Sequence, residues 1–206
     1  EKDGNKVLFH DIFTNGINYV RLVFDISDVP EELLQYVGLL RLFLGSVDTK
    51  NYSYKDLFNE INIQSGGIVP LINVYSDAAV EGKYCMTFDV KAKTLYQKTD
   101  KTLELMKEIM FFSDFTDKKH LLELIQESKS KMQASMMSAG HGTASVRAMS
   151  YFSEIAELSE RLNGIDHFRF LEDLEKHFDE RFDELIEGLN KALKFVFRKD
   201  NLMYDV

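Results

Sequence analysis

The chain has 206 residues, of which 45% are hydrophobic and 29% are charged, so its length and composition fit a globular domain with a sizeable core. Its net charge is −9, and an acidic surface repels the phosphates of nucleic acids and of anionic membranes. No apolar run approaches the ~20 residues that cross a bilayer, and no signal-peptide pattern opens the chain. We therefore expect neither a nucleic-acid partner nor a membrane partner.

The first strands are predicted from alternation and turn chemistry. A short apolar run over residues 7–10 is followed by Asn15-Gly16, a strong tight-turn signal. Apolar side chains then alternate with polar ones over residues 18–26, which predicts a half-buried strand.

Two helices should follow. Asp28, Pro30 and Glu31 match the chemistry of a capped helix start, so we expect a helix over residues 30–45. Ser53 and Asp56 repeat that pattern and predict a second helix, which ends at Gly66-Gly67.

A hairpin and a helical half complete the pattern. Alternating residues 68–74 and 84–90, joined by a polar loop around residues 77–82, predict an antiparallel hairpin. From about Thr99 the period becomes helical and predicts about five helices. Gly140-His141-Gly142 should interrupt the second of these, Thr143 should cap the third, and Asn163-Gly164 should end it. Residues 201–206 alternate again and predict a final strand.

This order of elements indicates an α+β fold in which one antiparallel sheet is covered by helices. No polar linker divides the chain, so we expect residues 1–206 to form a single domain. The chain starts at Glu1 rather than Met, which we interpret as the start of a fragment of a larger multidomain chain.

The single cysteine, Cys85, cannot form an internal disulfide, and it excludes zinc sites made of four Cys or of two Cys and two His. We expect it to be a small buried hydrophobe. A lone cysteine fits a reducing compartment, and we expect a cytoplasmic location.

Several segments together resemble a known family. They are residues 14–20 with 28–33, the Gln-Ser-Gly-Gly-Ile run at 64–68, the Ser-Ala-Gly-His-Gly run at 138–142 with Ser-Val-Arg-Ala at 145–148, and Asn-Gly-Ile-Asp at 163–166. Their order and spacing resemble the third domain of presequence-protease-like enzymes, in the insulinase (pitrilysin) class of zinc metallopeptidases. Ser65 departs from the threonine of the family pattern.

The resemblance implies the unit fold of the insulinase and mitochondrial-processing-peptidase type, within a parent enzyme of four such units that encloses unfolded peptides. In that family only the first unit carries H-x-x-E-H, whose histidines bind zinc and whose Glu activates water. The matching positions here hold Tyr36, Leu39 and Leu40, and none of them can play the catalytic role.

The resemblance therefore implies a non-catalytic structural and peptide-chamber domain. We expect no catalytic residue, no metal ligand and no cofactor in this chain, with zinc in the catalytic domain of the parent. The expected partners are the other domains of the same polypeptide and, in the intact enzyme, unfolded peptides. The alternative is a stand-alone peptide- or protein-interaction module.

Other histidines offer only partial sites. His120 and Glu123 have the spacing of the zinc motif, but Leu124 replaces its second His, and we expect a surface pair beside a buried leucine stripe. His167 and His177 lie among acidic residues without a shared ligand spacing, which favours a solvated helix surface.

Substrate-binding residues are unknown, and His141 is the candidate we single out because its flanking glycines allow close approach to a ligand. A helix break is the interpretation we favour over peptide contact. Exposed methionines suit promiscuous peptide binding, but helical spacing favours core filling for the cluster of Met132, Met136, Met137 and Met149.

Overall fold

The computed structural model describes residues 4–77, 79–80 and 82–206. Its elements are β1 (Lys6–Leu8), β2 (Ile17–Asp25), α1 (Leu34–Phe43), α2 (Tyr54–Gln64), β3 (Ile68–Ser76), β4 (Tyr84–Leu95), α3 (Thr99–Phe112), α4 (Lys118–Ser138), α5 (Gly140–Met149), α6 (Glu154–Asn163), α7 (Ile165–Lys176), α8 (Phe178–Val196) and β5 (Leu202–Asp205). Short 3-10 turns at Glu31–Leu33 and Tyr96–Lys98 lead into α1 and α3.

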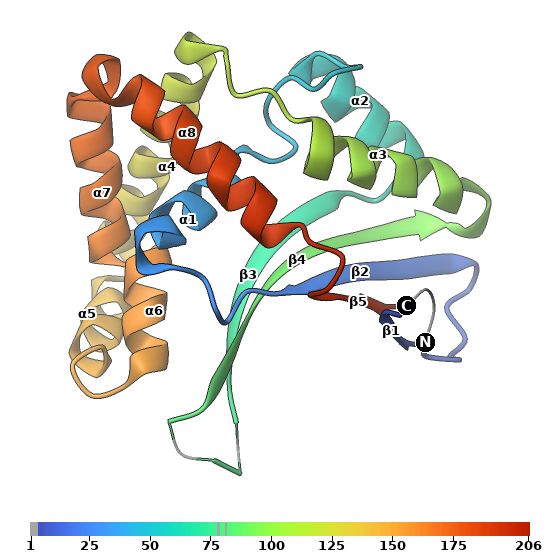
Figure 1. The fold of residues 1–206 in the computed structure, drawn as a ribbon, viewed down its shortest axis with the longest axis horizontal. Coiled ribbons are helices and arrows are strands. Elements are labelled where there is room, and N and C mark those ends of the chain that lie inside the picture. Colours follow the sequence, from blue (N-terminus) through green and yellow to red (C-terminus); the bar gives the residue numbers. More distant parts are fainter. Residues whose placement is uncertain (1–3, 78, 81) are drawn as a thin grey trace.

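The five strands form one sheet in the order β1-β5-β2-β4-β3, which confirms the α+β class. Strands β2, β3, β4 and β5 pair antiparallel, whereas β1 runs parallel to β5. This parallel pair was not expected. It sets the two ends of the chain side by side (Figure 1), and the backbone N–H of His10 donates to the carbonyl oxygen of Val206 at 2.8 Å.

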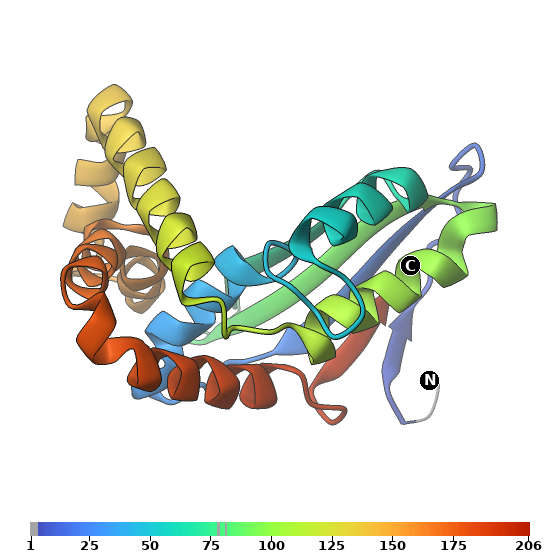
Figure 2. The same cartoon turned by 90° about the horizontal axis from the view of Figure 1, so that it is seen from above.

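Alternation along the strands gives the sheet one apolar face, and helices cover it. On β2 the buried side chains of this face are Val20, Leu22 and Phe24, and on β4 they are Met86, Phe88, Val90 and Ala92. In Figures 1 and 2 α2, α3 and α8 lie on the same side of the sheet, with α1 between α8 and α4. Burial of each large apolar side chain stabilises the fold by about 1.5–3 kcal/mol.

The helices α4 to α7 form a second group beyond the end of the sheet, far from the two termini (Figures 1 and 2). The helical half contains six helices in the described residues, one more than predicted, because the segment expected as one helix through Leu162 breaks at residues 150–153. Ser153 begins the second part, where its side chain accepts a hydrogen bond from the backbone N–H of Ala156.

The helix-start predictions had mixed outcomes. Ser53 caps α2 as predicted, accepting a hydrogen bond from the backbone N–H of Asp56 at 3.2 Å. The predicted cap at Asp28 is wrong, since its carboxylate instead lies 3.5 Å from the guanidinium of Arg198, near the end of the chain. Thr143 is not a cap either, because α5 already begins at Gly140.

Three remaining predictions concern the hairpin, the cysteine and the membrane. Strands β3 and β4 pair as the predicted antiparallel hairpin, although residues 78 and 81 of its loop lie outside the described residues. Cys85 is half-buried rather than buried. Among the described helices, none has the length and apolar character needed to cross a bilayer.

Candidate functional site

The positions that match the zinc motif lie on α1, and two of them belong to the core. Leu39 and Leu40 are completely buried, because they lie on the face of α1 that packs into the interior. Their side chains offer no lone pair to a metal and no proton acceptor to a water molecule. The residues at these positions therefore do not fit zinc.

Tyr36, at the third matching position, belongs to a polar contact with α8. Its hydroxyl donates to Glu184 at 2.8 Å, and Arg181 donates to the same carboxylate at 2.8 and 3.0 Å. Arg181 and then Tyr36 lower the pKa of Glu184 to about 2, while burial and Glu184 raise the pKa of Tyr36 to about 12. The pair is thus a neutral phenol on a firmly ionised carboxylate, and neither group is poised for proton transfer near neutral pH.

His120 and Glu123 lie close enough to pair, as the sequence predicts, but His120 is half-buried rather than on the surface. The His120 ring stacks on Tyr54 with centroids 4.1 Å apart, and its Nε2 lies 2.8 Å from the carbonyl oxygen of Ser46. Glu123 lies 3.7 Å away and is largely exposed. His120 therefore holds the start of α4 against α2 and the end of α1. No group of three potential ligands among His, Cys, Asp and Glu occurs in the described residues.

The prediction for His167 is wrong. It was expected on a solvated surface, yet its side chain is 2% exposed, and its Nδ1 lies 2.9 Å from the amide oxygen of Gln35. Gly38 makes room for it, because a Cβ there would lie 3.2 Å from the ring. Burial and the charge of Arg41 lower the pKa of His167 to about 4. His177, by contrast, is half-buried, and its Nδ1 lies 3.1 Å from the carboxylate of Asp173, one turn earlier.

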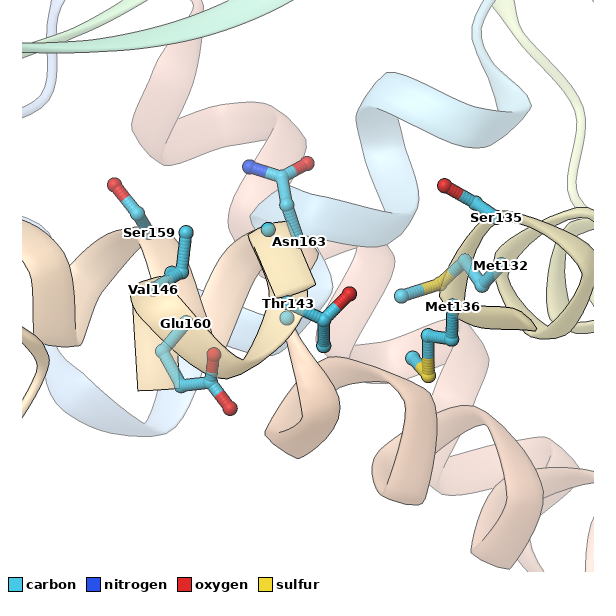
Figure 3. A pocket seen from close by; sticks show the side chains of 10 residues that line it. Met132, Ser135, Met136, Thr143, Val146, Ser159, Glu160 and Asn163 are labelled. Carbon is cyan, nitrogen blue, oxygen red and sulfur yellow. The ribbon is translucent and has the colours of Figure 1, made fainter. Parts of the chain in front are cut away.

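A cavity of about 240 Å³ opens between α4, α5 and α6, where several of the family-like segments meet. Figure 3 shows Met132 and Met136 entering from α4 on one side, with Thr143, Val146 and Glu160 from α5 and α6 on the other. Ser135, Gly142, Ser159, Asn163 and Gly164 complete its lining.

The cavity lies beside a buried carboxylate. Glu160 is 1% exposed, and its Oε1 accepts from Arg147 at 3.2 Å and from the backbone N–H of Ile165 at 3.0 Å. Arg147 also donates to Asp166 at 2.9 Å. Hydrogen bonds to Tyr151 first, then to Asp166 and Glu160, raise the pKa of Arg147. The Ser-Val-Arg-Ala and Asn-Gly-Ile-Asp segments are thus joined by one ion-pair network.

Gly164 is required by this network. A Cβ at position 164 would lie 2.1 Å from Oε2 of Glu160 and 2.8 Å from its Cα, so any side chain would displace the carboxylate. The predicted helix stop at Asn163-Gly164 is confirmed, since α6 ends at Asn163. Glu160 was not predicted, because its only local signal is a glycine four residues later.

His141 lies next to the cavity without lining it. It is exposed in the first turn of α5, and its carbonyl oxygen accepts from the Ser145 hydroxyl at 2.9 Å. The predicted interruption of the helix occurs, one residue earlier than expected, at Ala139. A contact between His141 and peptide stays a prediction.

The prediction of core filling is wrong for two of the four methionines. Met137 is 82% exposed and Met149 is 52% exposed. Met132 and Met136 are half-buried and line the cavity. Met132 and Met136 therefore border the cavity, where flexible thioether side chains can adapt to an occupant.

Comparison with known proteins assigns the chain to a family. Residues 1–174 match the model of a region associated with peptidases of family M16, subfamily C. Protein HypA of Clostridium perfringens is 32% identical over 98% of this chain and 21% of its own length. Presequence protease 1 of Arabidopsis thaliana is 32% identical over 95% of this chain and 18% of its own length. The mitochondrial presequence protease of Saccharomyces cerevisiae is 30% identical over 93% of this chain and 20% of its own length.

The chain therefore belongs to this peptidase-associated family, and the resemblance to presequence proteases is confirmed. It spans about a fifth of the length of these curated relatives and corresponds to a region within a larger polypeptide. A conserved protein from Enterococcus faecalis has the same fold, with a TM-score of 0.64 at 10% identity over 97% of this chain and 44% of that one.

Proposed function

We propose that this chain is a non-catalytic unit of a zinc-dependent metalloendopeptidase of the insulinase type, and that it forms part of the wall around a chamber for unfolded peptides. The proposal rests on the residues that occupy the motif positions of α1. A chain of this family holds two fully buried leucines where a catalytic unit would need a His and a Glu. The cofactor of the parent, zinc, would then be bound by another domain.

Exposed apolar side chains support contact with other domains of the same polypeptide. Phe13 is 93% exposed and Phe152 is 90% exposed, at opposite regions of the fold. On the sheet face opposite the helices, the alternation exposes Tyr19, Val69 and Tyr75. Exposed apolar side chains that are close together in the chain, such as Phe9, Ile12 and Phe13, or Tyr151 and Phe152, are typical of surfaces that another part of a larger protein covers.

The proposal is tested by activity and metal content. The purified chain, supplied with zinc, should not cleave a fluorogenic peptide in a chelator-sensitive way, and its bound zinc should stay far below one per molecule. Chelator-sensitive turnover by this chain would contradict the proposal. The reading frame of the parent should also encode H-x-x-E-H upstream of this region.

The same exposed groups also fit the alternative, a stand-alone interaction module. The upstream reading frame separates the two, because a parent without the zinc motif leaves only the interaction module. We also propose the cytoplasm as the location of the parent. The names of the relatives cited above place some of those proteins in mitochondria or chloroplasts, so cell fractionation of the source organism is the test.

A further inference from the structure

Glu160, on the lining of the cavity between α4, α5 and α6, has a buried acceptor oxygen that the fold does not use. Oε1 of Glu160 takes both donors that reach this carboxylate, and Oε2 has no hydrogen-bond partner among the described residues. A buried carboxylate oxygen without a donor is costly, and native proteins usually satisfy such a group with a protein donor, an ordered water or a bound ion or ligand.

From this arrangement we infer that the cavity is a binding site for a primary ammonium group, supplied by a lysine side chain of a peptide. The inference rests on the proposed function for its ligand, since a chamber wall meets unfolded peptides. The α-amino group at a peptide N-terminus has the same chemistry and is separated from lysine by the test below.

The local charge favours a cation. Glu160 and Asp166 share one guanidinium, that of Arg147, so this network of three groups carries one net negative charge. Arg41 also reaches the lining, where its guanidinium donates to Asn163 rather than to either carboxylate. Arg169 lies 3.9 Å from Asp166, but it is 68% exposed, where solvent screens it. The chain as a whole carries −9, which adds long-range attraction for a basic peptide.

The shape of the acceptor selects ammonium over guanidinium. A guanidinium binds best through two parallel hydrogen bonds to both oxygens of a carboxylate. Here Oε1 is already taken, so only one oxygen is left for the ligand. An ammonium is a compact charge that needs only one such oxygen, and Thr143 adds a hydroxyl to the same lining.

The rest of the lining fits the stem of lysine. Met132 and Met136 lie across the cavity from Val146, and the three side chains give it apolar walls (Figure 3). Long amphipathic side chains bury their methylenes along such walls while the charged end reaches a polar group. Oε2 itself is buried against Gly164, so the ligand must displace part of this lining to reach it.

The test uses methyl signals of the eight methionines of this chain, labelled with carbon-13. The probe is an alanine pentapeptide with lysine at its centre, acetylated and amidated at its ends. We expect saturable shifts of the Met132 and Met136 signals, with no shift for Met110 in the core. Replacement of lysine by norleucine, which keeps the stem and removes the charge, should weaken binding about tenfold or more.

Two further peptides define the ligand. An arginine peptide should bind more weakly than the lysine peptide, and equal or tighter binding would overturn the argument from the single free oxygen. An alanine pentapeptide with a free amino group should bind weakly as well. If it bound as tightly as the lysine peptide, the ligand would be a peptide N-terminus rather than a lysine side chain.

Variants localise the effect. Glu160→Gln should lower affinity for the lysine peptide about tenfold, whereas Glu157→Gln, on the exposed face of the same helix, should not change it. If Glu160→Gln fails to fold, Ser135→Trp blocks the cavity from the exposed side of α4 and should abolish the shifts. Equal binding of the norleucine peptide, or shifts unchanged in Ser135→Trp, would overturn the inference.

Failure of this inference is distinguishable from failure of the proposed function. A parent gene without H-x-x-E-H would contradict the proposed function, while lysine binding at Met132 and Met136 could still be observed. If the parent encodes the motif but the isolated unit does not bind the lysine peptide, the proposed function stands and only this binding site is contradicted.

Discussion

Two regions of this molecule differ in how closely their residues are packed. On α1, positions that match a zinc motif are occupied by Leu39 and Leu40, which are completely buried. Between α4, α5 and α6, a cavity is left open beside Glu160, a carboxylate with an unused oxygen. The residues of the first region pack in the core, whereas the second region combines an open cavity with a buried carboxylate.

The largest expected effect comes from forcing the first region back towards a metal site. The variant Tyr36→His, Leu39→Glu and Leu40→His puts a carboxylate and an imidazole where two leucines are fully buried. It should lose more than about 4 kcal/mol of unfolding free energy and bind no stoichiometric zinc. Urea denaturation and metal analysis measure the two effects. A folded variant with one tightly bound zinc would mean that α1 still holds the geometry of a metal site.

A pH-dependent effect is expected where α1 meets α7. The pKa of His167 falls from 6.5 to about 4 on folding, so the unfolded chain binds the proton first. Stability from this group is present above pH 6.5 and is lost as the pH falls towards 4, by on the order of 3 kcal/mol. Urea denaturation of the wild type and of His167→Gln at several pH values tests this. As the pH falls towards 4, the unfolding free energy of the wild type should drop by that amount relative to that of His167→Gln.

The control for His167 is His141→Gln, at an exposed position on α5. It should preserve the pH dependence of the wild type. Parallel profiles for the wild type and His167→Gln would show that the buried imidazole does not govern acid stability.

Gly164→Ala tests how tightly residues pack around Glu160 beside the cavity. The added Cβ would lie 2.1 Å from the Glu160 carboxylate, so we expect a loss of about 1–3 kcal/mol and weaker pairing with Arg147. Gly142→Ala is a matched control on the same cavity, because nothing lies within 4 Å of its Cβ. It should be neutral or stabilise α5 by up to about 1 kcal/mol. Equal responses of the two variants in thermal or urea unfolding would argue against a constrained carboxylate.

The smallest effect is expected at Tyr36. Tyr36→Phe removes one hydrogen bond to Glu184, which should cost about 0.5–1 kcal/mol. The pKa of Glu184 should rise from about 2 yet stay below its ordinary 4.5, because Arg181 still donates to it. Titration of this carboxyl by NMR measures the change. An unaltered pKa would mean that the Tyr36 hydroxyl does not contribute to the network.

The sequence by itself determined the elements whose signals are local. Alternation on β2 and β4, the Ser53 cap of α2, and the stop at Asn163-Gly164 all depend on neighbours within a few residues. The ordered family segments identified the family, and Leu39 and Leu40 excluded the H-x-x-E-H zinc motif at their positions, since the chemistry of a leucine side chain does not depend on the fold.

Only the tertiary structure decided the rest, because it concerns groups that are distant in the chain. The parallel β1–β5 pair joins the two ends, and the burial of His167 requires the approach of Gln35 and the space at Gly38. Hydropathy describes His and Glu as polar, so it predicts a solvated surface for both. Long-range packing instead buried His167 within the core and left Glu160 beside an open cavity, with only one of its two carboxylate oxygens hydrogen-bonded to the described residues.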